Sequence, residues 1–125
     1  MGSKVVARNI KLKRAYDYPL AEDGTRILID RLWPRGVRKA DAAIDQWVKD
    51  IAPSTGLRKW FGHDPARWRE FRRRYATEIY AHSDQLAELR ALARRGPITL
   101  VYSAHDEFHN DAVVLRDVLL GRRTR

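Results

Sequence analysis

Residues 25–36 read TRILIDRLWPRG, and this stretch indicates the architecture of the chain. The aliphatic run Ile27, Leu28 and Ile29 is typical of a strand buried on both faces of an α/β sheet, so we predict a strand over residues 25–32. An acid, two arginines, a tryptophan, a proline and a glycine follow the run directly. A buried strand that ends in two guanidinium groups raises the question of what those groups bind.

Two further strands are expected on either side of this stretch. Residues 98–102 (ITLVY) form a second apolar run, and residues 6–12 alternate loosely between apolar and polar side chains. Only residues 17–24 separate the strand at 6–12 from the strand at 25–32, which is short for a helical crossover. The relative direction of these two strands therefore stays open.

Helices are predicted where a capping residue precedes an apolar stripe at helical spacing. Asp64 followed by Pro65 begins such a helix, with Trp68, Phe71, Tyr75 and Ile79 on one side. The other predicted helices are a short one through Phe61 capped by Ser54 or Thr55, one from Ser83 to Gly96, and one from Asn110 or Asp111 to Gly121.

Residues 42–51 allow two interpretations. Ile44, Trp47 and Val48 match a helical stripe, whereas Asp45, Trp47 and Lys49 fit one edge of an irregular strand. The pattern does not decide between them.

The alternation of strands with helices predicts an α/β fold: a single domain with a small, largely parallel sheet flanked by helices. A chain of 125 residues is long enough to bury one hydrophobic core. We therefore assign residues 1–125 to one domain and expect residues 1–5 and 122–125 to be flexible.

Composition narrows the classes of function. The chain has 25 lysines and arginines against 16 acids, a formal net charge of +9, and no cysteine. The lack of cysteine excludes disulfide frameworks, thiolate metal sites and cysteine nucleophiles. No apolar run approaches the roughly 20 residues of a membrane helix, and no signal-peptide region opens the chain. We expect a cytoplasmic protein without a membrane partner.

The loops after the strands at 25–32 and 98–102 carry the groups best suited to a binding site. Ligands of open α/β sheets gather beyond the carboxyl ends of the strands. Arginine binds carboxylate or phosphate through two parallel hydrogen bonds, and a helix N-terminus near Asn110 adds positive charge. We predict a polar crevice for a small anionic ligand. The predicted ligand-binding residues are Arg31, Trp33, Arg35, Gly36, Ser103 and Asn110.

Whether the protein is an enzyme is not decided by these residues. Asp30 would orient one of the arginines or act as a base, and Asp30 and Ser103 are the candidate catalytic groups. In the alternative interpretation Arg31 pairs internally with Asp30 or with a carboxylate of the second loop. The crevice is then only a salt-bridge network in an interaction protein.

His105 and His109 lie four residues apart, a spacing that places metal ligands on one face of a helix. Here the interval straddles a loop and a helix start, and no third ligand or known metal motif accompanies the pair. We predict neither a bound metal nor a cofactor. A general base or a surface histidine is the better interpretation.

A second hypothesis is a nucleic-acid-binding protein that uses the helix from Arg67 to Arg74 and the basic C-terminal tail, residues 122–125. Five arginines crowd this helix, and Glu70 is placed to pair with Arg74. A solvated helix face explains the same pattern. We therefore expect at most weak, non-specific binding of nucleic acid, and the oligomeric state stays open.

Three blocks of the sequence, DRLWPRG, IAPSTGLRKWFGHDPARWREFRRRY and LVYSAHDEFHNDAVVL, carry a resemblance to a family. In their order and spacing they resemble the bacterial domain-of-unknown-function family 488, in its YeaO-like branch, over residues 10–120. The resemblance implies a small cytosolic α/β protein. The residues that match the family's motifs are Asp30, Arg31, Trp33, Pro34, Arg35, Gly36, Ala52, Pro53, Ser54, Leu57, Arg58, Tyr102, Ser103, Ala104 and Asn110.

The chain departs from related branches of this family at one point of chemical importance. Those branches resemble one another in a cysteine near the position of Ser103 and a Cys-His-Arg run near the last helix, and this chain has neither. Thiol chemistry therefore does not carry over. The resemblance marks a site without naming a reaction.

Overall fold

The computed structural model describes residues 5–123. The chain ends that we expect to be flexible, 1–5 and 122–125, fall largely on residues 1–4 and 124–125, which lie outside this range. Part of the basic tail invoked for nucleic-acid binding lies outside it as well.

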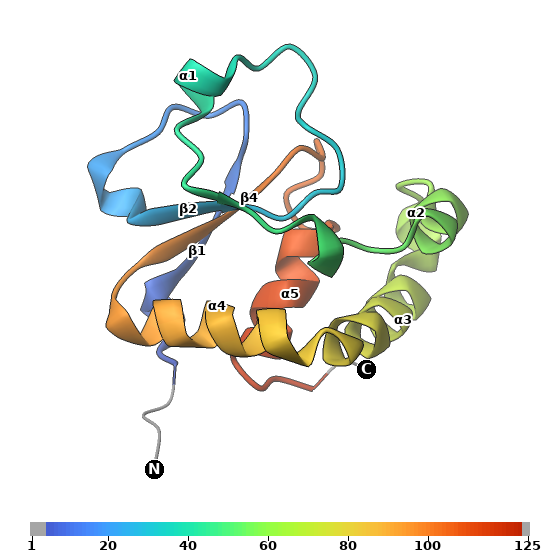
Figure 1. Ribbon diagram of the computed structural model, residues 1–125. Helices are drawn as coiled ribbons and strands as arrows, with labels where there is room; N and C mark the ends of the chain where they lie inside the picture. Colours follow the sequence, from blue (N-terminus) through green and yellow to red (C-terminus); the bar gives the residue numbers. More distant parts are fainter. Residues whose placement is uncertain (1–4, 124–125) are drawn as a thin grey trace.

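A four-stranded parallel sheet forms the centre of the protein (Figure 1). Its strands in chain order are β1 (Ile10–Arg14), β2 (Thr25–Leu28), β3 (Gln46–Trp47) and β4 (Ile98–Tyr102). Their order across the sheet is β1-β4-β2-β3, and every neighbouring pair is parallel. The predicted parallel α/β fold is confirmed. The open question about the first two strands is answered as well: β1 and β2 run in the same direction, with β4 between them.

Five helices accompany the sheet: α1 (Lys39–Ala42), α2 (Thr55–Phe61), α3 (Trp68–Ala81), α4 (Ser83–Arg95) and α5 (Asp111–Leu119). Three of the predicted caps are present. Ser54 accepts a hydrogen bond from the Leu57 amide at 3.2 Å, and Asp64 accepts one from the Ala66 amide at 3.0 Å. Asn110 accepts one from the Val113 amide at 3.1 Å. Side-chain capping thus sets where α2 and α5 begin, whereas Asp64 caps the 3-10 turn Pro65–Arg67 that leads into α3, so the helix predicted from Asp64 and Pro65 begins as α3 only at Trp68.

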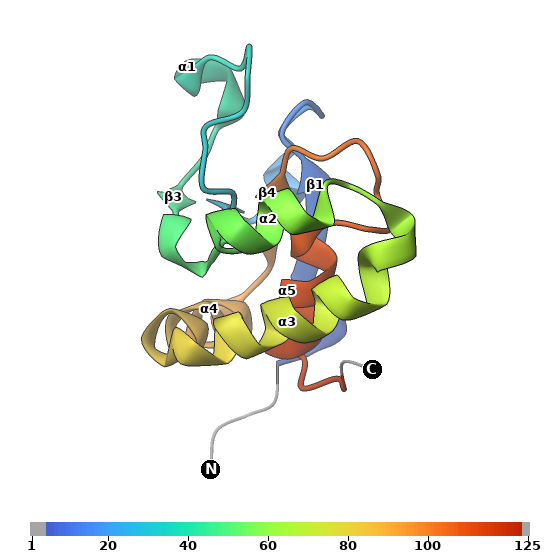
Figure 2. The same ribbon diagram turned by 90° about the vertical axis from the view of Figure 1, so that its right-hand side faces the viewer.

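The two faces of the sheet are covered differently. Ile27 and Leu100 point into the main core, which α2 to α5 cover; Figure 2 shows α3 in front of α5 and α4 to the left of it. Leu28 and Val101 point to the opposite face, because alternate residues of a strand face opposite sides. That face is covered by Trp33, Ile44 and Trp47 of the connection from β2 to β3, which carries α1 at the far end of the molecule from α4 (Figure 1).

The predicted bounds of two strands were wrong. The first strand spans Ile10–Arg14 rather than residues 6–12, because Ala7–Asn9 forms a 3-10 turn. The strand predicted over residues 25–32 ends at Leu28. The Ile29 amide still bonds to the Val101 carbonyl at 3.2 Å, but the chain then turns out of the sheet.

Residues 42–51 form no long helix. They contain the two-residue edge strand β3 and a 3-10 turn at Lys49–Ile51, so the irregular-strand interpretation is the nearer one. β3 pairs with β2 through the register of Ile27 with Gln46 and Leu28 with Trp47.

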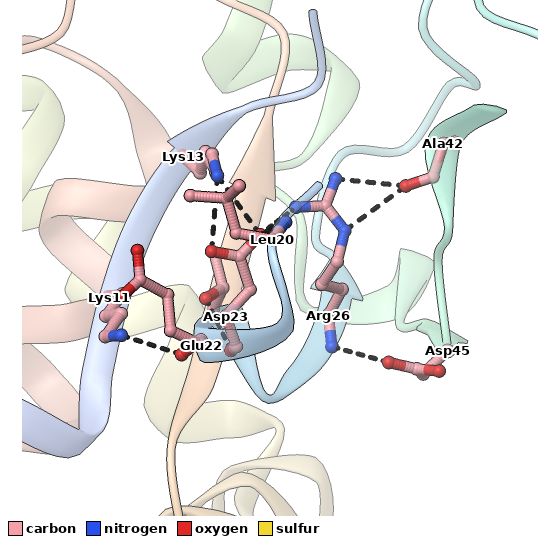
Figure 3. A network of polar contacts seen from close by, with 9 residues as sticks. Lys11, Lys13, Leu20, Glu22, Asp23, Arg26, Ala42 and Asp45 are labelled. Atoms are coloured by element: carbon pink, nitrogen blue, oxygen red, sulfur yellow. Dashed lines mark hydrogen bonds and ion pairs between the residues drawn. The ribbon is translucent and has the colours of Figure 1, made fainter. Parts of the chain in front are cut away.

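A largely buried ionic network links two strands of the sheet to α1 (Figure 3). The Arg26 guanidinium donates to the Asp23 carboxylate at 2.7 Å and to the Ala42 carbonyl at 3.0 and 3.2 Å. Lys13 on β1 reaches the same carboxylate at 3.2 Å. The network therefore joins β1, β2 and the segment that precedes β3.

Within residues 5–123 no helix has both the length and the apolar character needed to cross a membrane.

Candidate functional site

A cavity of about 550 Å³ lies beyond the carboxyl ends of β2 and β4. These strands are parallel neighbours, so the loops that follow them meet at one edge of the sheet. The structure places Asp30, Arg31, Trp33, Arg35, Ser103 and Asn110 in the cavity wall. Gly36 lies outside this wall. Its φ of 79° serves the turn that follows Arg35.

Side-chain hydrogen bonds to backbone hold the loop after β2. Trp47 Nε1 donates to the Asp30 carbonyl at 2.7 Å, and Trp33 Nε1 donates to the Val37 carbonyl at 2.6 Å. The two indole rings pack edge to face with their centroids 5.5 Å apart. The Tyr16 hydroxyl donates to the Arg35 carbonyl at 3.0 Å. The loop is thus fixed before any ligand arrives.

Three arginines, Arg31, Arg35 and Arg58, line the cavity, and none of them forms an ion pair with a carboxylate within residues 5–123. Within residues 5–123, Arg31 Nε is buried without a hydrogen-bond partner, and Nη2 makes only a long contact, 3.5 Å, with the Ala52 carbonyl. Internal pairing of Arg31, the alternative raised by the sequence, is therefore absent among the described residues. Its guanidinium keeps most of its donors available.

The loop after β4 is also held in place. Asp106 Oδ1 accepts hydrogen bonds from the amides of Phe108 and His109, at 2.9 and 3.1 Å. From β1, Arg14 Nε donates to the Ala104 carbonyl at 2.9 Å. Asn110 Nδ2 donates to the Asp106 carbonyl at 2.9 Å, which joins the loop to α5.

The amino end of α5 offers less to an anion than the sequence suggested. The Val113 amide is taken by Asn110 Oδ1, and the Ala112 amide by Asp111 Oδ1 at 3.0 Å. Two of the four orphan donors are thus satisfied by Asn110 and Asp111, and a carboxyl group stands at the first position of the helix. Anion binding in this cavity would depend on the arginines rather than on the helix terminus.

Asp30 and Asp111 place two carboxyl groups in the same cavity wall. Burial, followed by the charge of Asp30 and hydrogen bonding with its side chain, raises the pKa of the Asp111 carboxyl well above its ordinary value of 3.8. Two carboxylates at such close range cannot both ionise readily, so the pair retains a proton to a higher pH than an isolated acid does.

The backbone amide and the hydroxyl of Ser103 differ in their hydrogen bonding. Its amide donates to Asp30 Oδ2 at 2.9 Å. Its hydroxyl oxygen is buried and has no hydrogen-bond partner. A buried hydroxyl without a partner costs free energy, and a bound molecule can supply what it lacks.

The histidines have separate environments. His109 Nδ1 contacts Asp106 Oδ2 at 2.8 Å, and its ring packs edge to face on Trp68. The hydrogen bond from His109 is the main reason that the pKa of Asp106 is lowered from 3.8. His105 Nδ1 lies 3.4 Å from Arg14 Nη2. Within residues 5–123, no three His, Cys, Asp or Glu side chains are grouped so as to hold a metal ion.

Several residues of the cavity wall were missed as site residues. Arg58 and Phe61 come from α2 and Phe71 from α3, and the phenyl rings of Phe61 and Phe71 stack with centroids 4.2 Å apart. Sequence reasoning treated Phe71 as helix core and Asp111 only as an alternative cap. The sequence signal that could have identified Asp111 as a site residue was its position directly after Asn110, a predicted ligand-binding residue.

Three of the five arginines in the basic stretch make contacts within the protein. Glu70 receives hydrogen bonds from Arg73 at 2.6 Å and from Arg74 at 2.7 Å, so the predicted pair with Arg74 is present. Arg67 and Arg74 lie over the ring of Trp60, 5.2 and 4.5 Å from its centroid. These contacts compete with any phosphate for the same guanidinium groups.

A small parallel α/β sheet with a cavity at the carboxyl ends of its central strands defines a class that holds many unrelated activities. The particular family comes from sequence comparison. The chain belongs to the DUF488 family, and the model described as "Inactive DUF488-N3 subclade" matches residues 9–125.

Two relatives illustrate this membership. The chain is 46% identical over 111 residues to the uncharacterized protein YeaO of Escherichia coli, which covers 89% of this chain and 96% of that protein. It is 42% identical over 113 residues to the uncharacterized protein Rv3073c of Mycobacterium tuberculosis, which covers 90% of this chain and 95% of that protein. No solved structure matches the chain. The family resemblance seen in the sequence is confirmed.

Proposed function

We propose that this protein binds a small ligand bearing a carboxylate or phosphate in the cavity beyond β2 and β4. One observation carries the proposal: Arg31 is partly buried in the cavity wall, has no ion-pair partner within residues 5–123, and leaves Nε unsatisfied. Buried arginines are normally paired, so an unpaired one in a cavity favours an anion supplied from outside.

Two further features support an anion that is part of a larger molecule. Arg35 and Arg58 lie in the same wall, so more than one cation faces the space. Trp33, Phe61 and Phe71 give the wall apolar surface as well. Such a mixture of apolar walls with a few polar groups is typical of small-molecule sites.

Binding rather than turnover is the simpler form of this proposal. The matching family model is described as inactive, and the chain has no cysteine. Asp30 and Ser103 then serve as ligand contacts, and the catalytic roles considered for them are not needed. A cytoplasmic location stays a prediction.

Arg31→Lys tests the proposal. Lysine keeps the charge but loses the two-pronged geometry, so we expect roughly tenfold weaker binding of hydrocinnamate and phenyl phosphate, with little change in stability. Calorimetric titration measures the affinities and thermal melting the stability. Arg38→Lys is the matched control, since Arg38 pairs with Asp41 at 2.8 Å outside the cavity wall. Equal affinities in wild type and Arg31→Lys, or no binding of either probe, would overturn the proposal.

Nucleic-acid binding is expected only as a weak consequence of the net charge. We predict sequence-indifferent binding of duplex DNA whose affinity falls steeply with salt, by a slope close to the number of phosphates contacted. Fluorescence anisotropy at several salt concentrations measures this slope. Tight, salt-resistant binding to one defined sequence would favour the basic helix over the cavity as the functional surface.

A further inference from the structure

We propose that the ligand of this cavity is zwitterionic: besides the anionic group held by Arg31, it carries an amino group that the carboxyls of Asp30 and Asp111 bind as an ammonium. This inference rests on the proposed function and specifies the class of ligand. It follows from the hydrogen-bond acceptors that the carboxyl pair leaves unused and from two buried polar atoms, Arg31 Nε and Ser103 Oγ, in the same cavity wall.

The pair has unused acceptor capacity. Asp30 Oδ2 accepts the Ser103 amide at 2.9 Å, and Asp111 Oδ1 accepts the Ala112 amide at 3.0 Å. No lysine or arginine within residues 5–123 forms an ion pair with either carboxyl. Two carboxylates offer about eight lone-pair sites. A pair held by so few donors is electrostatically incomplete, and a cation from outside would complete it.

The second observation is independent of the acids. Of the buried side-chain nitrogen and oxygen atoms without partners in the described chain, two belong to this cavity wall, Arg31 Nε and Ser103 Oγ. Arg31 Nε is a donor that lacks an acceptor. Ser103 Oγ can accept a hydrogen bond and lies next to the carboxyl pair, because the amide of Ser103 contacts Asp30. An anion and a hydrogen-bond donor on one ligand would satisfy both atoms.

An ammonium fits this arrangement better than a metal ion. Calcium and magnesium take six or more oxygen ligands, and structural zinc takes four protein ligands. Within residues 5–123 no third acid or histidine joins the pair to make such a group. An ammonium has three donors, and Asp30, Asp111 and the Ser103 hydroxyl supply three acceptors.

The cavity also has space for an apolar body between the two charges. Its volume of about 550 Å³ falls within the range of small-molecule sites. Phe61 and Phe71 stack in one part of the wall, and Trp33 lies in the loop after β2. The ligand class is therefore an amino acid, or an amine of similar size, with an aromatic or aliphatic side chain.

Binding of the ammonium should displace the proton that the pair shares. The charged and titratable groups around the pair are Arg31, Tyr75 on α3 and Tyr102 on β4. The rest of the cavity wall adds Arg35, Arg58, His63, His105, His109 and Asp106. Burial raises the pKa of both tyrosines, so they stay neutral over the accessible range. Binding should therefore release protons and tighten as the pH rises.

Three probes with the same ring test the inference: L-phenylalanine has both charges, hydrocinnamate only the anion, and phenethylamine only the cation. In the wild-type protein we expect L-phenylalanine to bind roughly tenfold tighter than either of the others. Calorimetry in buffers of different ionisation enthalpy should show proton release with L-phenylalanine but not with hydrocinnamate.

Asp111→Asn should remove the preference, because asparagine keeps the acceptor for the Ala112 amide but not the charge. L-phenylalanine should then bind no tighter than hydrocinnamate, while hydrocinnamate binding is kept. Asp106→Asn is the matched control, an acid of the same wall that faces His109, and the preference should survive it.

The outcomes separate the two proposals. Hydrocinnamate binding that depends on Arg31, without preference for L-phenylalanine, overturns the inference and leaves the proposed function standing. A preference that survives Asp111→Asn, or that disappears in Asp106→Asn, also overturns the inference. If neither anionic probe binds at millimolar concentration, the proposed function and this inference both fail.

Discussion

Gly24→Ala is expected to lower the free energy of unfolding by more than about 3 kcal/mol, or to prevent folding. Gly24 has a φ of 66°, and a Cβ atom there would lie 2.0 Å from the Pro97 carbonyl oxygen and 2.7 Å from its carbon. Both atoms are backbone, so neither can rotate away. The Thr25 amide bonds to that same carbonyl at 3.1 Å, where β2 and β4 begin to pair. Accommodating a methyl group would separate these strands at their first contact.

Gly36→Ala separates this clash from the effect of the backbone conformation alone. Gly36 also has a positive φ, 79°, but a Cβ atom there would meet nothing within 4 Å. Alanine at this position should cost only about 1–2 kcal/mol. Denaturant unfolding followed by circular dichroism measures both variants. Similar losses at the two positions would show that the approach of Gly24 to Pro97 is not what limits stability.

The second large effect is expected from Asp23→Asn, at about 3–5 kcal/mol of unfolding free energy. The side chains of Asp23 and Arg26 are only 5% and 4% exposed, so the variant leaves a buried guanidinium without its carboxylate. The matched control is Asp41→Asn, which breaks a pair with Arg38 whose side chains are 59% and 82% exposed. That exposed pair should contribute less than about 1 kcal/mol. Equal effects would mean that burial of the network does not matter.

Asp23→Asn should also change how the stability of the protein depends on pH. Burial raises the pKa of Asp23, but hydrogen bonds from the Leu20 amide, Lys13 and Arg26 outweigh it, and the net pKa lies below 3.8. A depressed folded-state pKa means that the contribution is complete above the unfolded-state value of 3.8 and is lost as the pH falls through the folded-state value. The difference in stability between wild type and Asp23→Asn should therefore shrink at acidic pH. A constant difference would contradict this assignment.

The sequence predicted those elements whose signals are local. Residues 98–102 were identified as a strand at its observed bounds, because the whole run is apolar and buried. The starts of α2 and α5 were predicted to within one residue, from Ser54 or Thr55 and from Asn110 or Asp111, and the structure has Ser54 and Asn110 as the caps. In contrast, the end of β2 depends on the chain turning after Ile29, where Trp47 donates to the Asp30 carbonyl. That contact joins residues 17 apart, and no local pattern encodes it.

Sequence reasoning identified one side of the site better than the other. Arg31, Trp33 and Arg35 follow a buried strand, and the rule that sites lie at the carboxyl ends of strands led directly to them. The opposing wall, with Phe61 and Phe71, comes from helices whose docking against the sheet is a tertiary event. The contact of Asp30 with Asp111 is likewise invisible in a linear pattern. It depends on β4, which pairs with β2 and also packs against α5.

The position of β4 between β1 and β2 also has a consequence for how the chain is made. Among the strands of residues 5–123, β1 pairs with β4 alone, and β2 has only the two-residue β3 as a partner before β4 is added. During synthesis both early strands therefore leave the ribosome with open edges, and they wait until residue 102 has emerged. The sheet can close only after β4 has been translated. In the cell, unpaired strands in this interval are exposed to misassociation and to chaperones.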